Sequence, residues 1–234
     1  MGQRQDNLVG LLENAGYRVV LTQRPCLRRQ DIEATDLGSE VLRVYKQLDG
    51  ELDDFPDRVG RWDLRVGAVA IELDEERHFN RYRLNTLTSS VYSRLPKLPL
   101  SAYRSYCAQR EAQCLAAAKH GGYWSNASCI RQFGPKSSEG DLTPPGSPRW
   151  KQRAFYDFLK DLSPIICDTW LARISIWDDV PVNGVNVPVN QVLLSRSLEA
   201  TLGLVALIEE RAGVNLLPND QIATLWLHLF VFLP

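Results

Sequence analysis

The stretch RWDLRVGAVAIELDEERHFNRYR, residues 61–83, decides the fold expected for this chain. Gly67 and Ala68 suit a two-residue β-turn, because a type II′ turn requires glycine at its first central position. With that turn, residues whose numbers have the same sum face each other across a hairpin, so Asp63 faces Glu72. The sequence therefore predicts a β-hairpin centred on this turn.

Side chains alternate between the two faces of a strand, so the predicted register sorts the hairpin into an apolar and a polar face. The expected apolar face carries Trp62, Leu64, Val66, Val69, Ile71 and Leu73. The expected polar face carries Arg61, Asp63, Arg65, Ala70, Glu72 and Asp74. A register shift of one residue would move each set to the other face, so the clean separation supports the turn.

Carboxylates gather on the polar face of this hairpin. Like charges directly opposite each other destabilise a strand pair, so Asp63, Glu72 and Asp74 require protonation or a cation. Mg²⁺ prefers such oxygen ligands, and the hairpin is therefore predicted to hold a divalent metal ion. The alternative is an ordinary exposed face on which the acids pair with Arg61 and Arg65.

The stretch IELDEERH resembles the core of the PD-(D/E)XK nuclease superfamily, and most closely its very-short-patch-repair-type endonucleases. In that branch the strand reads Glu, apolar, Asp, Gly and then His after two further residues, downstream of an Asp. Glu72, Asp74 and His78 match by spacing, and Asp63 fits the upstream acid. Two positions depart from the pattern: Asp74 replaces the signature lysine, and Glu75 replaces the usual glycine.

The resemblance covers residues 1–23, 60–83 and 149–178, where a helix with Lys151 and a strand with Arg173 match the family's last two elements. It implies an α/β (α+β) fold, a restriction-endonuclease-like core with a mixed central sheet flanked by helices. We expect this core over residues 1–178, interrupted by a helical and loop insertion at about 84–148. Residues 179–234 are expected to be a C-terminal helical extension that packs on the core.

The element pattern outside the hairpin follows from apolar spacing and from glycine or proline breaks. Helices are expected at 4–15, 32–48, 150–162 and 190–212, mostly helical structure at 84–132, strands at 17–21 and 171–177, and a loop at 133–149.

The resemblance also implies a function, hydrolysis of DNA phosphodiester bonds by a Mg²⁺- or Mn²⁺-dependent endonuclease in repair, restriction or defence. DNA is favoured over RNA as the partner. The implied roles are metal binding by Asp63, Glu72 and Asp74, proton transfer by His78, positive charge from Lys151, and phosphate contacts from Arg77, Arg81 and Arg83. Glu13 is a further candidate ligand on the first helix.

Three alternatives stay open at this point. The chain could be a non-catalytic nuclease-like scaffold or DNA-binding module, since a fold does not establish chemistry. It could also be a metal-dependent phosphohydrolase on another fold. Finally, His78 and Lys151 suit ordinary hydrogen-bonded or solvated positions.

Cysteines suggest a second metal site. Cys107, Cys114, His120 and Cys129 are the residue types of a zinc site but lack the short loop between paired cysteines of common zinc modules. Cys107 and Cys114 are seven residues apart and would share one face of a helix, so buried core thiols are the favoured interpretation over structural zinc.

Bulk properties place few restrictions on function. The chain has 234 residues, 44% of them hydrophobic, and a net charge of −1, so total charge points to neither nucleic acid nor membrane. Five cysteines and the absence of a secretory pattern favour the cytoplasm and no membrane association. The apolar segment 222–234 is expected to pack on the domain or on a second copy, which would make a homodimer.

Overall fold

The computed structural model describes residues 2–21, 27–57, 60–195 and 197–218. The chain forms two compact units. Unit 1 comprises residues 1–23, 62–73 and 170–234, and unit 2 comprises residues 24–61 and 74–169. Along the chain, unit 2 is therefore made of two insertions into unit 1.

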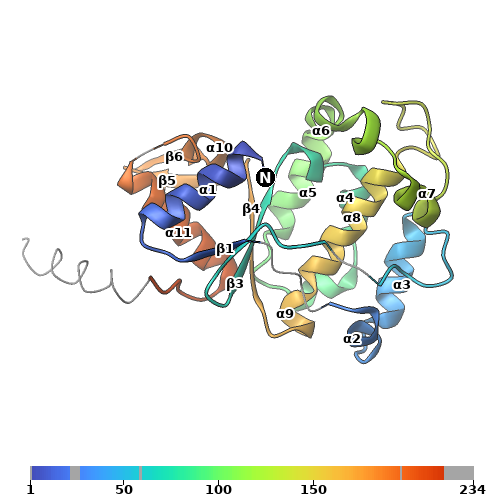
Figure 1. Cartoon of the computed structure of the whole chain (residues 1–234), viewed down its shortest axis with the longest axis horizontal. Helices are drawn as coiled ribbons and strands as arrows, with labels where there is room; N and C mark the ends of the chain where they lie inside the picture. Colours follow the sequence, from blue (N-terminus) through green and yellow to red (C-terminus); the bar gives the residue numbers. More distant parts are fainter. Residues whose placement is uncertain (1, 22–26, 58–59, 196, 219–234) are drawn as a thin grey trace, which may run out of the picture. The chain divides into compact units, whose positions relative to one another are not determined.

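Unit 1 is built on a mixed sheet of four strands (Figure 1). The strands are β1 (Val19–Leu21), β2 (Leu64–Val66), β3 (Val69–Asp74) and β4 (Trp170–Ser175), in the order β1-β2-β3-β4. The first two pairs are antiparallel, and β3 and β4 form the one parallel pair of this sheet. The predicted α/β class with a mixed sheet is thus confirmed.

The hairpin of β2 and β3 has the predicted register. Val66 pairs with Val69, and Leu64 pairs with Ile71. Gly67 has φ +55°, in the left-handed region that glycine adopts at little cost. A side chain at Gly67 would meet no atom within 4 Å, so backbone conformation alone selects glycine here.

One face of the sheet packs against two helices of unit 1, α1 (Gln3–Asn14) and α11 (Leu198–Ala212) (Figure 1). The core takes Leu64, Val66, Val69, Ile71 and Leu73 from the hairpin, and Ala172 and Ile174 from β4. Burial of such side chains stabilises a fold by roughly 1.5–3 kcal/mol each, so this face holds unit 1 together.

Trp62 does not join this face, and the prediction that it would is wrong. It packs with Ala70 and Leu171 in a separate cluster. The physical reason is that β2 begins only at Leu64 and the chain bends at Asp63. The alternation of a regular strand therefore does not extend back to Trp62.

A second hairpin follows β4, in a region expected to be helical. Strand β5 (Asp179–Val182) pairs antiparallel with β6 (Val185–Pro188). Asn183 and Gly184 both have positive φ, 50° and 78°, as the two central residues of a type I′ turn do. The Asn-Gly pair between apolar residues is a strong hairpin signal, which the sequence analysis missed. The short helix α10 (Val189–Val192) then leads to α11, which ends at the expected glycine, Gly213, in the left-handed conformation.

Unit 2 is helical and surrounds α8 (Pro148–Asp161), which packs against α3 (Gly38–Gln47), α4 (Arg81–Thr86) and α7 (Ala127–Phe133) (Figure 1). The other elements of unit 2 are α2 (Arg29–Glu33), η1 (Glu76–His78), η2 (Ser90–Arg94), α5 (Leu100–Gln109), α6 (Glu111–Ala118), η3 (Gly121–Tyr123) and α9 (Ser163–Ile166). Ser147 caps α8 by accepting the N–H of Trp150, and Pro148 occupies its first turn.

Helix α8 buries charged and polar residues together with its apolar stripe. The buried polar members are Lys151, Gln152, Asp157, Lys160 and Asp161. Because an unpaired charge is costly to bury, each such residue marks a place where a partner must be close. The partner of Asp157 is His78, which belongs to the candidate site.

Candidate metal centre

Three side chains of unit 2 converge on one point. Asp74 is the last residue of β3, His78 ends the short helix η1, and Asp157 lies in the second half of α8. The η1 turn is closed by the His78 N–H, which donates to the carbonyl of Glu75. This turn brings the His78 imidazole close to the carboxylate of Asp74, four residues earlier.

The distances between these side chains suit a common ligand. His78 Nδ1 lies 2.8 Å from Asp157 Oδ2 and 3.2 Å from Asp74 Oδ1. One ligand atom from each of the three residues lies within 4.8 Å of the other two. Two neighbouring ligands on an octahedral ion with metal–ligand bonds of about 2.1 Å are roughly 3.0 Å apart. The group could therefore hold a metal ion.

The two carboxylates of this group are buried, whereas its imidazole is partly exposed. The side chains of Asp74 and Asp157 are 1% and 4% exposed, whereas that of His78 is 23% exposed. Two buried carboxylates repel each other and require positive charge nearby. Either an imidazolium or a metal ion can supply it, and the partly exposed His78 leaves the group open on one side.

Asp74 is also held in position by a neighbour. Tyr103, a buried residue of α5, donates from Oη to Asp74 Oδ2 at 2.7 Å. This leaves Oδ1 as the oxygen nearest His78. Such outer hydrogen bonds fix the orientation of a ligating carboxylate.

Asp63 and Glu72, the other two predicted ligands, belong to unit 1. The Leu73 N–H donates to Asp63 Oδ2 at 2.9 Å, and the Asp63 N–H donates to Glu72 Oε1 at 3.2 Å. Gln5 donates to the main-chain carbonyl of Asp63. Both carboxylates thus bond to the main chain where the β2–β3 hairpin opens.

Within the ranges that the structure describes, Asp74, His78 and Asp157 form the one group of three or more acidic, histidine or cysteine side chains close enough to share an ion. The sequence pattern predicted Asp74 and His78 as site residues but did not indicate Asp157 as a ligand. A signal existed, because Asp157 lies three residues after Ala154 and seven after Trp150, on the buried stripe of α8.

Lys151 and Arg83, two predicted site residues, are engaged elsewhere in unit 2. Lys151 Nζ forms an ion pair with Asp49 Oδ2 at 2.7 Å. Arg83 Nη2 pairs with Asp161 Oδ2 at 2.7 Å, and both side chains are at most 1% exposed. A guanidinium buried in this way does not reach a phosphate, so we leave Arg83 out of any nucleic-acid surface.

The remaining two arginines of the predicted phosphate set are more accessible. Arg81 pairs with Glu111 at 2.7 Å, and its side chain is half exposed. Arg77 pairs with Glu75 at 3.0 Å and lies over the ring of Tyr123, 4.9 Å from its centroid.

The four cysteine and histidine positions considered for zinc do not converge in the described chain. Cys107 and Cys114 are buried, and burial raises the pKa of each thiol to about 12. Cys129 is buried against Asn126, while His120 is exposed beside Glu139.

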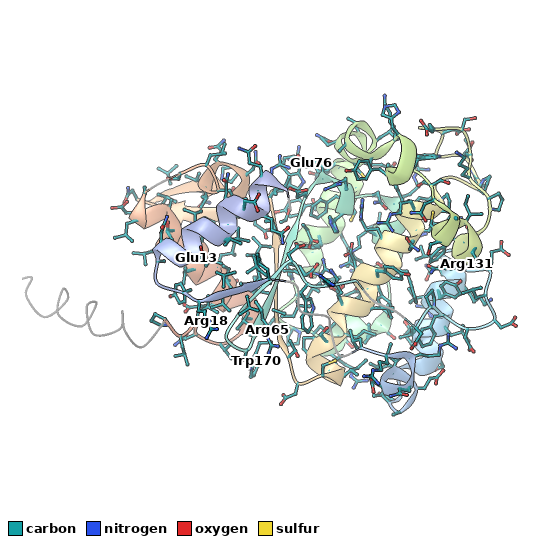
Figure 2. The ribbon with its side chains drawn as sticks, viewed as in Figure 1. Glu13, Arg18, Arg65, Glu76, Arg131 and Trp170 are labelled. Atoms are coloured by element: carbon teal, nitrogen blue, oxygen red, sulfur yellow. The ribbon has the colours of Figure 1, made fainter. Side chains whose placement is uncertain are left out.

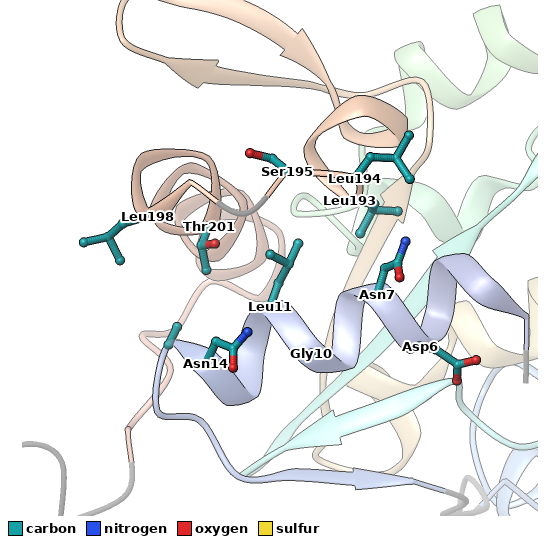
Figure 3. Close-up of a pocket in the computed structure, with 11 residues that line it drawn as sticks. Asp6, Asn7, Gly10, Leu11, Asn14, Leu193, Leu194, Ser195, Leu198 and Thr201 are labelled. Carbon is teal, nitrogen blue, oxygen red and sulfur yellow. The ribbon is translucent and has the colours of Figure 1, made fainter.

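Unit 1 carries a further predicted ligand and a groove. Glu13, the additional candidate ligand, is exposed on α1 (Figure 2). A groove of about 660 Å³ lies between α1, the turn that follows α10 and the start of α11 (Figure 3). Its lining mixes Asp6, Asn7 and Asn14 with leucines such as Leu194 and Leu198, and it contains none of the predicted site residues.

The fold and the site together define an α/β protein with a buried Asp–His–Asp group able to hold a metal ion. The chain belongs to a family of unknown function (DUF7255), which matches residues 43–195 and so covers both strands of the β2–β3 hairpin, η1 and α8. No curated protein and no solved structure matches the chain. No described helix combines the length and apolar character needed to cross a membrane.

Proposed function

We propose that this protein is a metal-dependent nuclease that hydrolyses phosphodiester bonds of DNA, with its ion held by Asp74, His78 and Asp157. The observation that carries the proposal is the approach of two buried carboxylates and one imidazole to within 4.8 Å of one another. Carboxylates and imidazoles are ligands of divalent ions, and bound divalent ions catalyse hydrolysis in phosphatases and nucleases.

The types of ligand also indicate which ion the group would prefer. Carboxylates suit Mg²⁺ and Mn²⁺, whereas an imidazole suits softer transition metals better than Mg²⁺. Of the two ions expected from the sequence, Mn²⁺ fits the combination of Asp74, His78 and Asp157 better than Mg²⁺.

The order of elements supports the nuclease interpretation. Helix α1 precedes β1, β2 and β3, and after the helices of unit 2 the chain continues through α8 into β4. This is the order in which the PD-(D/E)XK resemblance matched the sequence. Asp63 and Glu72 were expected to be ligands but are not members of this group. We assign them to stabilising the hairpin through their hydrogen bonds to the main chain.

A bound divalent ion would polarise the phosphoryl oxygen and stabilise the charge that develops during hydrolysis. Asp74 and Asp157 would hold it from two separate elements, and Tyr103 would keep the Asp74 carboxylate in its orientation. A ligating imidazole is neutral, so His78 would hold the ion through an unprotonated ring nitrogen.

A non-catalytic scaffold remains the second candidate, because the 2.8 Å contact of His78 with Asp157 is also an ordinary charge-assisted hydrogen bond. In that case the pair would tie η1 to α8 without any ion. The two candidates differ in whether a metal stabilises the fold.

Thermal melting with Mn²⁺, Mg²⁺ or EDTA separates these candidates, using the parent protein and Asp157→Asn. An ion at 100 times its dissociation constant stabilises the folded state by about 2.7 kcal/mol, so the parent should melt higher with Mn²⁺. Asp157→Asn should lose this increase. Asp141→Asn, the same change at an exposed loop residue of unit 2, should keep it.

The same proteins should then be incubated with plasmid DNA, single-stranded DNA and RNA in each metal. We expect cleavage by the parent and by Asp141→Asn, and its loss in Asp157→Asn and in EDTA. If the melting temperature of each of the three proteins is the same with and without metal, and none of them cleaves any substrate, the scaffold would be the better description.

A further inference from the structure

Beside the metal centre, three arginines gather around α8 and η1. Arg149 and Arg153 lie one helical turn apart on α8, and Asp157 lies one turn further along the same face. Arg153 Nη1 donates to the main-chain carbonyl of Arg77 at 3.3 Å, and Arg77 directly precedes His78. The cations therefore come from two separate elements and adjoin two of the three candidate ligands.

The three arginines differ in how their charge is compensated, since Arg77 pairs with Glu75 at 3.0 Å. Within the described residues, neither Arg149 nor Arg153 has a carboxylate at ion-pair distance, and Nε of Arg149 is buried without a hydrogen-bond partner. Arg149 also lies in the first turn of α8, where the helix dipole disfavours a cation.

The pKa of Arg153 is lowered, as expected for a cation that is buried close to other cations. Burial, followed by the positive charges of Arg149 and Arg77, lowers the pKa of Arg153 to about 10, although Asp157 acts in the opposite direction. A divalent ion on Asp74 and Asp157 would take up the negative charge of these acids. The arginines would then favour an anion even more strongly.

An exposed aromatic ring adjoins this cluster. Tyr123 of η3 is 50% exposed, and Arg77 lies over its ring at 4.9 Å from the centroid. Exposed aromatic rings next to arginines are platforms on which unpaired nucleobases stack. Bases inside a duplex are already stacked and cannot use such a platform.

We propose that these three arginines bind the backbone phosphates of a single-stranded nucleic acid and that Tyr123 stacks on one of its bases. The inference rests on the proposed function, since it places the substrate beside the metal centre. It adds two residues, Arg149 and Arg153, that neither the sequence pattern nor the family assigns to a site, and it selects single strands over duplexes.

Binding of a fluorescein-labelled oligothymidine, followed by anisotropy in EDTA over a range of salt concentrations, tests the proposal without requiring metal or catalysis. Each phosphate contact on a single strand contributes about 0.7 to the slope of log affinity against log salt. Arg149→Gln and Arg153→Gln should each weaken binding and reduce this slope by about that amount. Tyr123→Ala should weaken binding roughly 5-fold or more at every salt concentration, with little change of slope.

The matched control is Arg131→Gln, which removes an exposed arginine from α7 in the same unit (Figure 2). It should bind like the parent, and a duplex of equal length should bind more weakly than the single strand. If Arg153→Gln does not fold, as judged by melting, Arg153→Lys should retain the salt slope while Arg149→Gln loses part of it. Parent-like binding by all variants, or an equal loss in Arg131→Gln, would overturn the proposal.

The result is separable from that of the cleavage assay. Loss of oligothymidine binding in the arginine variants of a protein that cleaves nothing would reject only the nuclease function. Metal-dependent cleavage that survives unchanged in all of these variants, with parent-like binding, would reject only the arginine and tyrosine surface.

Discussion

Buried charges in this protein are held by specific partners. Arg83 and Asp161 show this most clearly, since Asp161 also accepts a hydrogen bond from Tyr92 at 2.7 Å. Removing one member of a buried ion pair leaves an uncompensated charge, which typically costs 3–5 kcal/mol. A pair of well-packed apolar residues in the same space is often tolerated far better.

We therefore predict that Asp161→Ala lowers the free energy of unfolding by about 3–5 kcal/mol, measured by urea denaturation. The double variant Arg83→Met with Asp161→Leu should recover most of this loss, because no charge remains buried. A double variant less stable than Asp161→Ala alone would contradict this account of the pair.

The buried thiols lead to a prediction about reactivity. Burial raises the pKa of Cys107 and Cys114 to about 12, from 9.0 for an ordinary thiol, so at pH 8 almost no thiolate is present at these two positions in the folded protein. Iodoacetamide at pH 8 should label partly exposed Cys167 in the folded protein and label Cys107 and Cys114 only after unfolding. Peptide mass spectrometry before and after urea treatment measures the labelling.

The sign of the corresponding pH effect follows from proton linkage. Above pH 9 the unfolded chain loses the two thiol protons that the folded chain retains, so stability should fall between pH 9 and about 12. Cys107→Ser with Cys114→Ser should show a smaller fall over this range than the parent does. Rapid labelling of both thiols in the folded protein at pH 8 would contradict the burial.

At the level of elements, the turn of the β2–β3 hairpin sets the course of β3 and so the position of its last residue, Asp74. Its turn needs Gly67 for a backbone reason alone, since there is room for a side chain. Left-handed backbone costs an ordinary residue roughly 1–2 kcal/mol, and asparagine tolerates it better than most.

Gly67→Val should therefore destabilise the protein by about 1–2 kcal/mol or more, and Gly67→Asn by clearly less. Comparison of the two variants by thermal melting checks this, because both add a side chain at the same position. Equal destabilisation would point to crowding at the turn instead of backbone conformation. Gly184→Val in the β5–β6 turn, where φ is 78° and space is also open, should repeat the pattern.

At the level of the whole molecule, unit 2 enters the chain of unit 1 at two connections, between β1 and β2 and between β3 and β4. The second of these, residues 74–169, carries Asp74, His78 and Asp157 and the proposed nucleic-acid surface. Helix α8 belongs to this helical unit, which extends beyond the expected insertion at about 84–148 on both sides.

Truncation after Pro218 tests the expectation for the apolar C-terminal segment, which lies outside the described residues. Unit 1 already exposes Leu194, Leu198 and Leu217, and further exposed apolar side chains would favour aggregation. If the segment packs on the domain or on a second copy, the truncated protein should melt lower and aggregate more readily. Sedimentation velocity and melting curves that match those of the full chain would contradict that packing.

Sequence by itself determined the features that depend on neighbouring residues. The turn at Gly67, the register of Leu64 with Ile71 and the end of α11 at Gly213 all follow from local backbone preferences and from alternation with period two. The apolar stripe of α8 follows in the same way from helical spacing. These signals are short-range, so one sequence suffices to read them.

Only the tertiary structure decided which acids meet. The sequence grouped Asp63, Glu72 and Asp74 because they are close along a hairpin, whereas folding brings Asp74 and His78 to Asp157, 79 residues beyond His78. Asp63 and Glu72 bond instead to main-chain N–H groups where the chain bends before β2. Partners so distant in sequence are brought together by the packing of η1 against α6 and of α4 against α8, and that packing depends on the whole of unit 2 rather than on any local pattern.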